Sequence, residues 1–354
     1  MTTDYATYFP EGLQDMLSQV GKAVERGLIS SGQLDQVLRA LGSLPPYMIV
    51  KAGPFVRQAA NLSYRWPEPS RRWWQFPRRR SEQELLDHHR ELAFLFLFHR
   101  NGYLRQAALD RIDGPLESAF WFTAIARCTN DAVEEVRFAA EACAQRTFPK
   151  TDAATIVEAA LFLCDNAPNW GRRRAEPSIL ERTLTRLDIE AALAELVLTT
   201  RDSRCVPLLR YLLRYAVVDK YLHRWFRSAS LPWVRAVSLK TLLTGEATWQ
   251  TGLERHWIDE SMGVYRMRPG VGRRPVEHAH SRAALISQGF EDRSATVRRV
   301  ALDGLIRNRD QLPALTALVR KALHDRNRAV RDRAEYLARQ LSPELLSDDQ
   351  PEAL

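Results

Sequence analysis

A ten-residue phrase, Asp292-Arg-Ser-Ala-Thr-Val297-Arg298-Arg-Val-Ala301, recurs near the C-terminus as Asp325-Arg-Asn-Arg-Ala-Val330-Arg331-Asp-Arg-Ala334. Both copies read aspartate, four residues, Val-Arg, two residues and alanine, and they begin 33 residues apart. A period of this length is typical of chains built from stacked pairs of helices. The phrase therefore predicts an all-α chain made of repeated helical pairs.

Each part of the phrase has a physical reading. Apolar residues at helical spacing precede each aspartate, so the aspartate is expected in the turn, where its carboxylate can accept from N–H groups of the next helix. The valine and the alanine, four residues apart, share one face of that helix, and the small alanine lets a neighbouring helix approach. The arginine after the valine lies on the flank, where it can pair with an aspartate of a neighbouring copy. We interpret this pairing as structural.

Looser copies of the phrase occur upstream. They are Phe55-Val-Arg57-Gln-Ala-Ala60, Tyr103-Leu-Arg105-Gln-Ala-Ala108, Asp131–Ala140 and Val234-Arg235-Ala-Val-Ser238. The phrase resembles the HEAT repeat. The resemblance implies a right-handed α-solenoid of about seven to eight HEAT-like helical pairs with two loop insertions.

We expect residues 1–354 to form a single solenoid, in which Ser81-Glu-Gln-Glu84 has the form of a capping box that starts a helix. Its expected parts are an N-terminal cap and first repeat (1–62), an Arg/Trp-rich insertion (63–81), repeats (82–244), an insertion or degenerate repeat (245–281), two regular repeats (282–342) and an acidic tail (343–354).

The composition is that of an ordinary globular chain with a basic excess. Its 51 lysines and arginines outweigh 43 acidic residues, for a net charge of +8, and only six of the basic residues are lysines. Arginine suits bidentate contacts with phosphate and carboxylate, so the excess permits nucleic-acid binding without requiring it. The longest apolar run, 93–98, is too short to cross a bilayer, and the N-terminus has no secretory signal. We expect a cytoplasmic, bacterial protein with four buried free cysteines.

The first insertion is the leading candidate site. Three prolines forbid a regular helix through 63–81, and arginines alternate there with aromatic residues. This mixture suits a protein partner or a nucleic-acid strand; alternatively, the rings cover the edge of the solenoid. The candidate residues are Arg71, Arg72, Trp73, Trp74, Arg78, Arg79 and Arg80.

The second insertion is predicted to contain a loop, because residues 267–275 are rich in glycine and proline. Gly270 and Gly272 could let backbone amides approach a phosphate, but the ending of a P-loop is missing, and a solvated loop is the alternative. Val234 and Val297 are 63 residues apart, close to two periods, so a repeat is hidden here or replaced. The candidate residues are Arg266, Arg268, Arg273 and Arg274.

Enzymatic and metal sites are weakly indicated. His278 and His280, with His256 and Glu277, lack a standard ligand spacing, so no metal, cofactor or catalytic residue is predicted. A HEAT-like DNA glycosylase resembles this chain in repeat architecture and basic charge. That resemblance implies a concave-face cluster, for which the candidates would be Trp225, Trp233, Arg235 and Asp219, unless the tryptophans only pack between helices.

The sequence therefore predicts a non-catalytic scaffold or adaptor that binds a partner protein through its solenoid surface and its Arg/aromatic insertions, with no membrane contact. The alternative is a HEAT-like protein that binds nucleic acid, including a DNA-repair glycosylase of the alkylation-repair type. The oligomeric state stays open.

Overall fold

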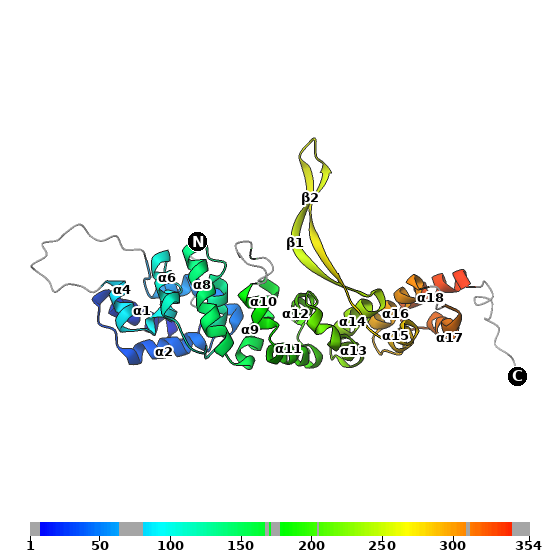
Figure 1. Ribbon diagram of the computed structural model, residues 1–354, viewed down its shortest axis with the longest axis horizontal. Helices are drawn as coiled ribbons and strands as arrows, with labels where there is room; N and C mark the ends of the chain where they lie inside the picture. The colour runs from blue at the N-terminus through cyan, green and yellow to red at the C-terminus, as the bar shows by residue number, and fades with distance from the viewer. Residues whose placement is uncertain are drawn as a thin grey trace, which may run out of the picture. The chain divides into compact units, whose positions relative to one another are not determined.

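The computed structural model describes residues 8–63, 81–166, 170, 178–203, 205–308 and 312–341 (Figure 1). Within these ranges the chain is mostly helical, as the sequence predicts, with one two-stranded antiparallel sheet. It divides into two compact units, Met1–Ala192 and Leu193–Leu354. None of the helices that the structure describes combines the length and the apolarity needed to span a bilayer.

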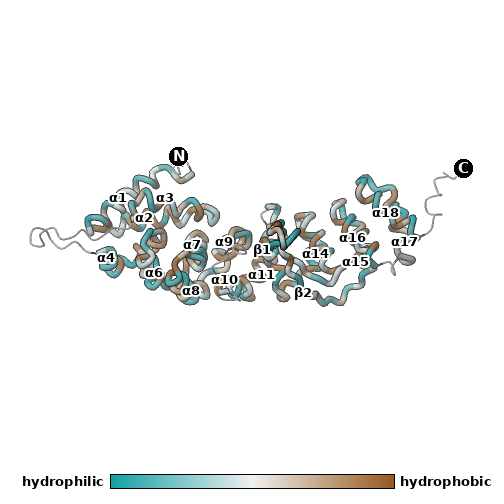
Figure 2. Tube along the Cα trace, turned by 90° about the horizontal axis from the view of Figure 1, so that it is seen from above, coloured by the Kyte–Doolittle hydropathy of each residue, from teal (hydrophilic) through white to brown (hydrophobic). Residues whose placement is uncertain are grey.

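The first unit is built from helices that bury one apolar face each, and apolar positions recur along them in Figure 2. Apolar residues at helical spacing form a buried stripe along α1 and another along α2, among them Leu17, Val20, Leu34 and Leu41. Gly21 lets α1 approach the end of α3, because a Cβ at this position would collide with the carbonyl group of Ala60. The helices are α1 (Leu13–Arg26), α2 (Ser31–Gly42), α3 (Ile49–Ala59), α4 (Glu82–His88), α5 (Leu92–Phe96), α6 (Gly102–Arg111), α7 (Ala119–Cys128), α8 (Glu134–Thr147), α9 (Ala153–Asn166) and α10 (Ile179–Leu184).

Two sequence-level details of this unit are confirmed. The backbone N–H of Ser81 donates to Glu84 Oε2 over 2.8 Å, and the N–H of Glu84 donates to Ser81 Oγ, so the predicted capping box starts α4. All four cysteines are free and buried, and burial raises the pKa of Cys143 to about 11.

The second unit is a series of helical pairs. Within it, α13 packs on α14, α15 on α16 and α17 on α18, and α14, α16 and α18 contact one another in turn. The helices are α11 (Leu187–Thr199), which begins in the first unit, α12 (Cys205–Leu212), α13 (Asp219–Ser228), α14 (Pro232–Thr244), α15 (Arg282–Phe290), α16 (Ala295–Arg307), α17 (Leu312–Leu323) and α18 (Arg328–Leu341).

Ion pairs join successive copies of the phrase, as the sequence predicts. In each pair the arginine that follows the Val or Leu of one copy binds both carboxylate oxygens of the aspartate that opens a later copy. The pairs, with their shortest nitrogen–oxygen distances, are Arg105–Asp131 (2.7 Å), Arg235–Asp292 (2.8 Å) and Arg298–Asp325 (2.7 Å).

Each arginine of these pairs also closes the turn before its own helix. Arg298 Nη1 donates to the carbonyl of Asp292 over 2.9 Å, and Asp325 accepts from the N–H of Asn327 over 2.8 Å. The hydrogen bond from Arg298 is the main cause that lowers the pKa of Asp325. One side chain therefore ties a helix to the turn behind it and to the next turn.

The spacing of these pairs shows where the period breaks. Arg298 and Asp325 are 27 residues apart, but Arg235 and Asp292 are 57 apart. The surplus of 30 residues equals the length of an antiparallel hairpin, β1 (Glu246–Asp259) and β2 (Val264–Pro275), inserted between α14 and α15. No repeat is hidden in this interval.

The loop predicted within residues 245–281 is therefore wrong. The glycines and prolines that suggested a loop are accommodated because each strand of a two-stranded ribbon is an edge strand. Pro269, opposite Leu253, has no N–H to donate, and an edge strand tolerates this because one side of its backbone pairs with no other strand. Residues along the ribbon are exposed beyond its base, so it extends away from the helices of the second unit (Figure 1). We call β1, β2 and their turn the ribbon.

Candidate functional site

The base of the ribbon is fixed to the second unit by Arg274. Its Nε donates to the carbonyl of Leu213 over 2.9 Å, and its Nη2 donates to the carbonyl of Tyr215 over 2.8 Å. Both terminal nitrogens of the guanidinium also bind the carboxylate of Asp219. Arg274 is thus a predicted binding residue that the structure places in an anchor, where its donors are already used.

The entry and exit of the ribbon are held together by the backbone. Gly245 ends α14 with a φ of 66°, a left-handed conformation that favours glycine, and turns the chain into β1. The N–H of Val276 donates to the carbonyl of Gly245 over 2.8 Å, and Ala247 is buried beside them. The two ends of the ribbon therefore leave the helices at one point.

One face of the ribbon is apolar and exposed. The register places Leu253, Arg255 and Trp257 on the same face as their opposite residues in β2, which include Met267 and Tyr265. Four of these side chains are far from buried: Leu253 is 68% exposed, Trp257 41%, Tyr265 44% and Met267 44%. We call Leu253, Arg255, Trp257, Tyr265 and Met267 the apolar face.

The rings of this face support one another. Trp257 meets Tyr265 edge to face, with ring centroids 5.3 Å apart and planes at 75°. The guanidinium carbon of Arg255 lies 4.9 Å from the centroid of Tyr265. These contacts hold the aromatic side chains in place in the absence of any partner, which lowers the entropy that binding would cost.

The opposite face is polar. Glu254 faces Arg268 across the strands, and His256 faces Arg266, so both predicted arginines lie beside titratable partners rather than in a cluster of their own. Arg273 lies nearer the base, 4.0 Å from a carboxylate oxygen of Glu246. The four predicted arginines are thus divided among three surroundings.

The expected approach of a phosphate to the glycine amides is not supported. The indole of Trp249 lies over Gly272, where a Cβ would collide with the ring, and the side chains of Thr251 and Glu254 lie over Gly270. These glycines make room for cross-strand side chains. The carboxylate of Glu254, which lies beside Gly270, would also repel an anion.

The tip of the ribbon is an ordered turn with apolar ends. Asp259 accepts hydrogen bonds from the N–H groups of Ser261 and Met262 and from the Ser261 hydroxyl, which lowers the pKa of Asp259. Ile258 and Met262 are exposed beside it. The tip therefore continues the apolar surface and adds a fixed negative charge.

The remaining predicted site residues fall into two groups. The first insertion, with Arg71, Arg72, Trp73, Trp74, Arg78, Arg79 and Arg80, lies outside the described residues.

The second group, suggested by the glycosylase resemblance, has structural contacts. Trp225 is buried and donates to the carbonyl of Ala194, Arg235 is paired with Asp292, and Asp219 binds the ribbon anchor. Trp233 stacks with Arg210, whose guanidinium carbon lies 5.4 Å from the ring centroid. These residues do not form an open site.

The histidines near the ribbon do not form a metal site either. The ring of His280 stacks on that of His223 with centroids 4.0 Å apart, and His278 Nε2 lies 2.6 Å from the carbonyl oxygen of Leu242. Among the residues that the structure describes, no group of three or more His, Cys, Asp or Glu side chains could hold a metal ion.

Sequence reasoning missed the apolar face. The signal was present, since Leu253, Arg255 and Trp257 alternate with polar residues and Tyr265 and Met267 alternate beyond an Asp-Glu-Ser-Met-Gly turn. The alternation with a period of two, which indicates a strand, is short and lies between segments with helical periodicity, so it was overlooked.

A scan against protein-family models finds no match to the chain, and neither does a search of curated proteins.

Proposed function

We propose that the chain is a non-catalytic scaffold that binds a partner protein through the apolar face of the ribbon. The observation that carries the proposal is an exposed row of Leu253, Trp257, Tyr265 and Met267 on an element that extends from the helices. Burying one such side chain is worth about 1.5–3 kcal/mol, so the row holds enough apolar surface for a specific interface.

The chemistry of the face favours a protein surface with an apolar groove. Tryptophan, tyrosine, methionine and arginine are enriched at protein interfaces, and all four occur here. Beta-strand 1 has 14 residues, so the ribbon reaches roughly 45 Å and can enter a groove that a helical surface cannot.

The charges of the ribbon argue against a nucleic-acid backbone as its partner. Between residues 246 and 275 five arginines stand against four carboxylates, and one arginine is used in the anchor. Asp259 and Glu260 at the tip would face phosphates if the ribbon entered a groove of a duplex.

The helices would supply the scaffold. We propose a right-handed, HEAT-like α-solenoid, in line with the recurrent phrase, the paired helices of the second unit and the Arg–Asp pairs that join successive copies. An array of this kind tolerates an inserted element in an inter-helix turn, and such insertions often lie on the binding face.

The test is partner binding by two matched variants of the full chain, Trp257→Ala and Tyr103→Ala. Tyr103, on α6 of the first unit, is an exposed aromatic residue that is not part of the ribbon. Proteins retained from a bacterial extract are identified, and the affinity of each purified partner is then measured by calorimetry. We expect Trp257→Ala to weaken binding by about 2 kcal/mol or more and Tyr103→Ala to change it little.

Equal affinity of the native chain and Trp257→Ala for every identified partner would refute the proposal. A nucleic-acid partner whose affinity falls steeply with salt and is weakened by Trp257→Ala would support the alternative function instead.

A further inference from the structure

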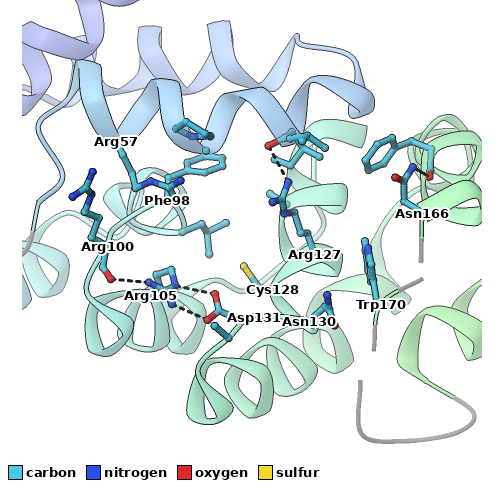
Figure 3. A pocket seen from close by; sticks show the side chains of 18 residues that line it. Arg57, Phe98, Arg100, Arg105, Arg127, Cys128, Asn130, Asp131, Asn166 and Trp170 are labelled. Carbon is cyan, nitrogen blue, oxygen red and sulfur yellow. Dashed lines mark hydrogen bonds and ion pairs between the residues drawn. The ribbon is translucent and has the colours of Figure 1, made fainter. Parts of the chain in front are cut away.

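The first unit contains a cleft with an unusual charge. It has a volume of about 780 Å³ and is lined by residues of α3, α6, α7 and α9, of the turns that follow α5 and α7, and by Trp170 (Figure 3). Four arginines line it: Arg57, Arg100, Arg105 and Arg127. We call it the arginine cleft.

Asp131 is the one carboxylate among the lining residues, and it is already engaged. Arg105 donates to both of its oxygens, over 3.0 and 2.7 Å, and the third nitrogen of Arg105, Nη1, donates to the carbonyls of His99 and Arg100. This pair belongs to the series of ion pairs that joins the repeated phrases, so both carboxylate oxygens already have a partner, and Asp131 acts on Arg57 only through its charge.

Those three arginines lack anionic partners among the described residues. Arg57 and Arg100 make no side-chain hydrogen bond or ion pair there, and Arg127 has one long hydrogen bond, 3.4 Å to the carbonyl of Ile49. Arg57 is half-buried, and its burial, followed by the charges of Arg100 and Arg105, lowers its pKa. The charge of this guanidinium is thus poorly compensated in the free protein.

An anion in the cleft would remove this imbalance. A guanidinium offers donors in a planar fork that fits phosphate oxygens in pairs, and partial burial strengthens the contact relative to bulk water.

The other end of the cleft has a different chemistry. Figure 3 shows Arg57, Arg100 and Arg105 at one end and Asn166 and Trp170 at the other. Trp170 is half-buried and lines the cleft. An aromatic ring with an amide beside it is suited to a planar, hydrogen-bonding base.

We propose that the arginine cleft binds a nucleoside phosphate, with the phosphate at Arg57 and Arg100, the base at Trp170 and Arg127 between the two (Figure 3). The ligand is either a free nucleotide or a nucleotide within a single strand, since both offer this chemistry. The site is independent of the ribbon, and its occupancy can be tested without the partner protein.

The cleft is a binding site rather than a reactive one. Cys128 is its one thiol among the lining residues, and burial, reinforced by Asp131, raises the pKa of that thiol to about 12. It stays protonated at neutral pH and cannot serve as a thiolate nucleophile.

The experiment is calorimetric titration of the full chain with AMP, ATP, adenosine, inorganic phosphate and a single-stranded oligonucleotide of about ten nucleotides, at low and at physiological salt. We expect AMP or the oligonucleotide to bind more tightly than adenosine and phosphate do. Binding by AMP assigns a free nucleotide, and binding by the oligonucleotide alone assigns a strand.

Two variants and a control locate the site. Arg57→Gln should weaken binding by about tenfold or more, because a charged hydrogen-bonding partner is lost. Trp170→Ala should weaken binding of AMP but not of phosphate. Arg90→Gln, which removes an exposed arginine outside the cleft in the same unit, should leave binding unchanged.

A thermal-unfolding control separates loss of the site from loss of the fold. Without ligand, the unfolding temperature of Arg57→Gln should equal or exceed that of the native chain, because a poorly compensated charge has been removed. The inference is overturned if no nucleotide or oligonucleotide binds at low salt, if Arg57→Gln binds as the native chain does, or if phosphate binds as tightly as AMP.

Discussion

The side chain of Arg235 is 3% exposed, and its guanidinium joins three segments of the second unit. It donates to the carbonyls of Ala229 and Ser230 at the end of α13, and to both oxygens of Asp292 in the turn before α16. A buried charge of this kind is tolerated because each of its three nitrogens donates to an acceptor. Its contribution to the fold can be measured by removing it, because Asp292 would then lose its partner.

Replacing Arg235 by alanine should lower the free energy of unfolding of the second unit by about 3 kcal/mol, because a largely buried Asp292 would lose its counter-charge. Denaturation by urea, followed by circular dichroism, measures the change. The control is Arg328→Ala: Arg328 is 87% exposed and lies 3.9 Å from Asp332, so its loss should cost less than about 1 kcal/mol. Equal effects of the two substitutions would contradict the assigned role.

The Arg–Asp pairs and the arginine cleft differ in how well the sequence predicts them. Arg298 and Asp325 belong to one phrase, so their pairing could be anticipated from its spacing. Arg57, Arg100 and Arg127 line one cleft only because α3, α7 and the turn after α5 pack together. Arg57 belongs to a looser copy of the phrase, but no local pattern marks Arg100 or Arg127 or brings the three together, so only the packing reveals the cleft.

At the scale of elements, the ribbon needs support from the helices. A two-stranded hairpin alone is at best marginally stable in water, and most side chains of this one are exposed. Its support is concentrated at the base, in the bonds of Arg274 to Asp219 and to two carbonyls, and in the stacking of Trp249 over Gly272.

Adjacent arginines of β2 provide a matched test of this anchor. Arg274→Ala should destabilise the ribbon by about 1–3 kcal/mol, seen as faster hydrogen exchange of its backbone amides, because Asp219 loses its charged donor. Arg273→Ala should change exchange little, since Arg273 is exposed and 4.0 Å from Glu246. The same acceleration in both variants would show that the anchor lies elsewhere.

The ribbon also marks the limit of prediction at this scale. The helices of the repeated phrase, the buried stripes of α1 and α2 and the capping box at Ser81 follow from periodicity and local hydrogen bonding. Pro269 and the glycines of β2 reproduce the composition of a loop. Only the cross-strand register, which pairs Trp257 with Tyr265 and Trp249 with Gly272, explains them as strand residues.

At the scale of the whole molecule, the ribbon is an addition to the helical plan of the second unit. Without it the separation of Arg235 and Asp292 would be 27 residues, the value found for Arg298 and Asp325. Helices on both sides keep their pairing, because α14 contacts both α15 and α16. The helical fold and the ribbon can therefore be separated experimentally.

Replacing residues 246–275 by a Gly-Ser link should leave the helices of both units folded and abolish binding of the partner protein. Loss of the Arg274 anchor should lower the free energy of unfolding by no more than about 1–3 kcal/mol. Helical circular dichroism, thermal unfolding and binding of the partner measure the three effects, and nucleotide binding by the arginine cleft should persist. Collapse of the second unit would show that the ribbon is part of its core.

The hydrogen bond between the N–H of Val276 and the carbonyl of Gly245 closes the ribbon at its neck. Because the chain leaves and re-enters at one point, growth or shortening of the strands by paired residues would leave the neck unchanged. Reach could therefore vary by about 7 Å for each two residues per strand while the helices stay the same. In evolutionary terms, this closing hydrogen bond marks an insertion site at which related helical proteins could carry hairpins of different length.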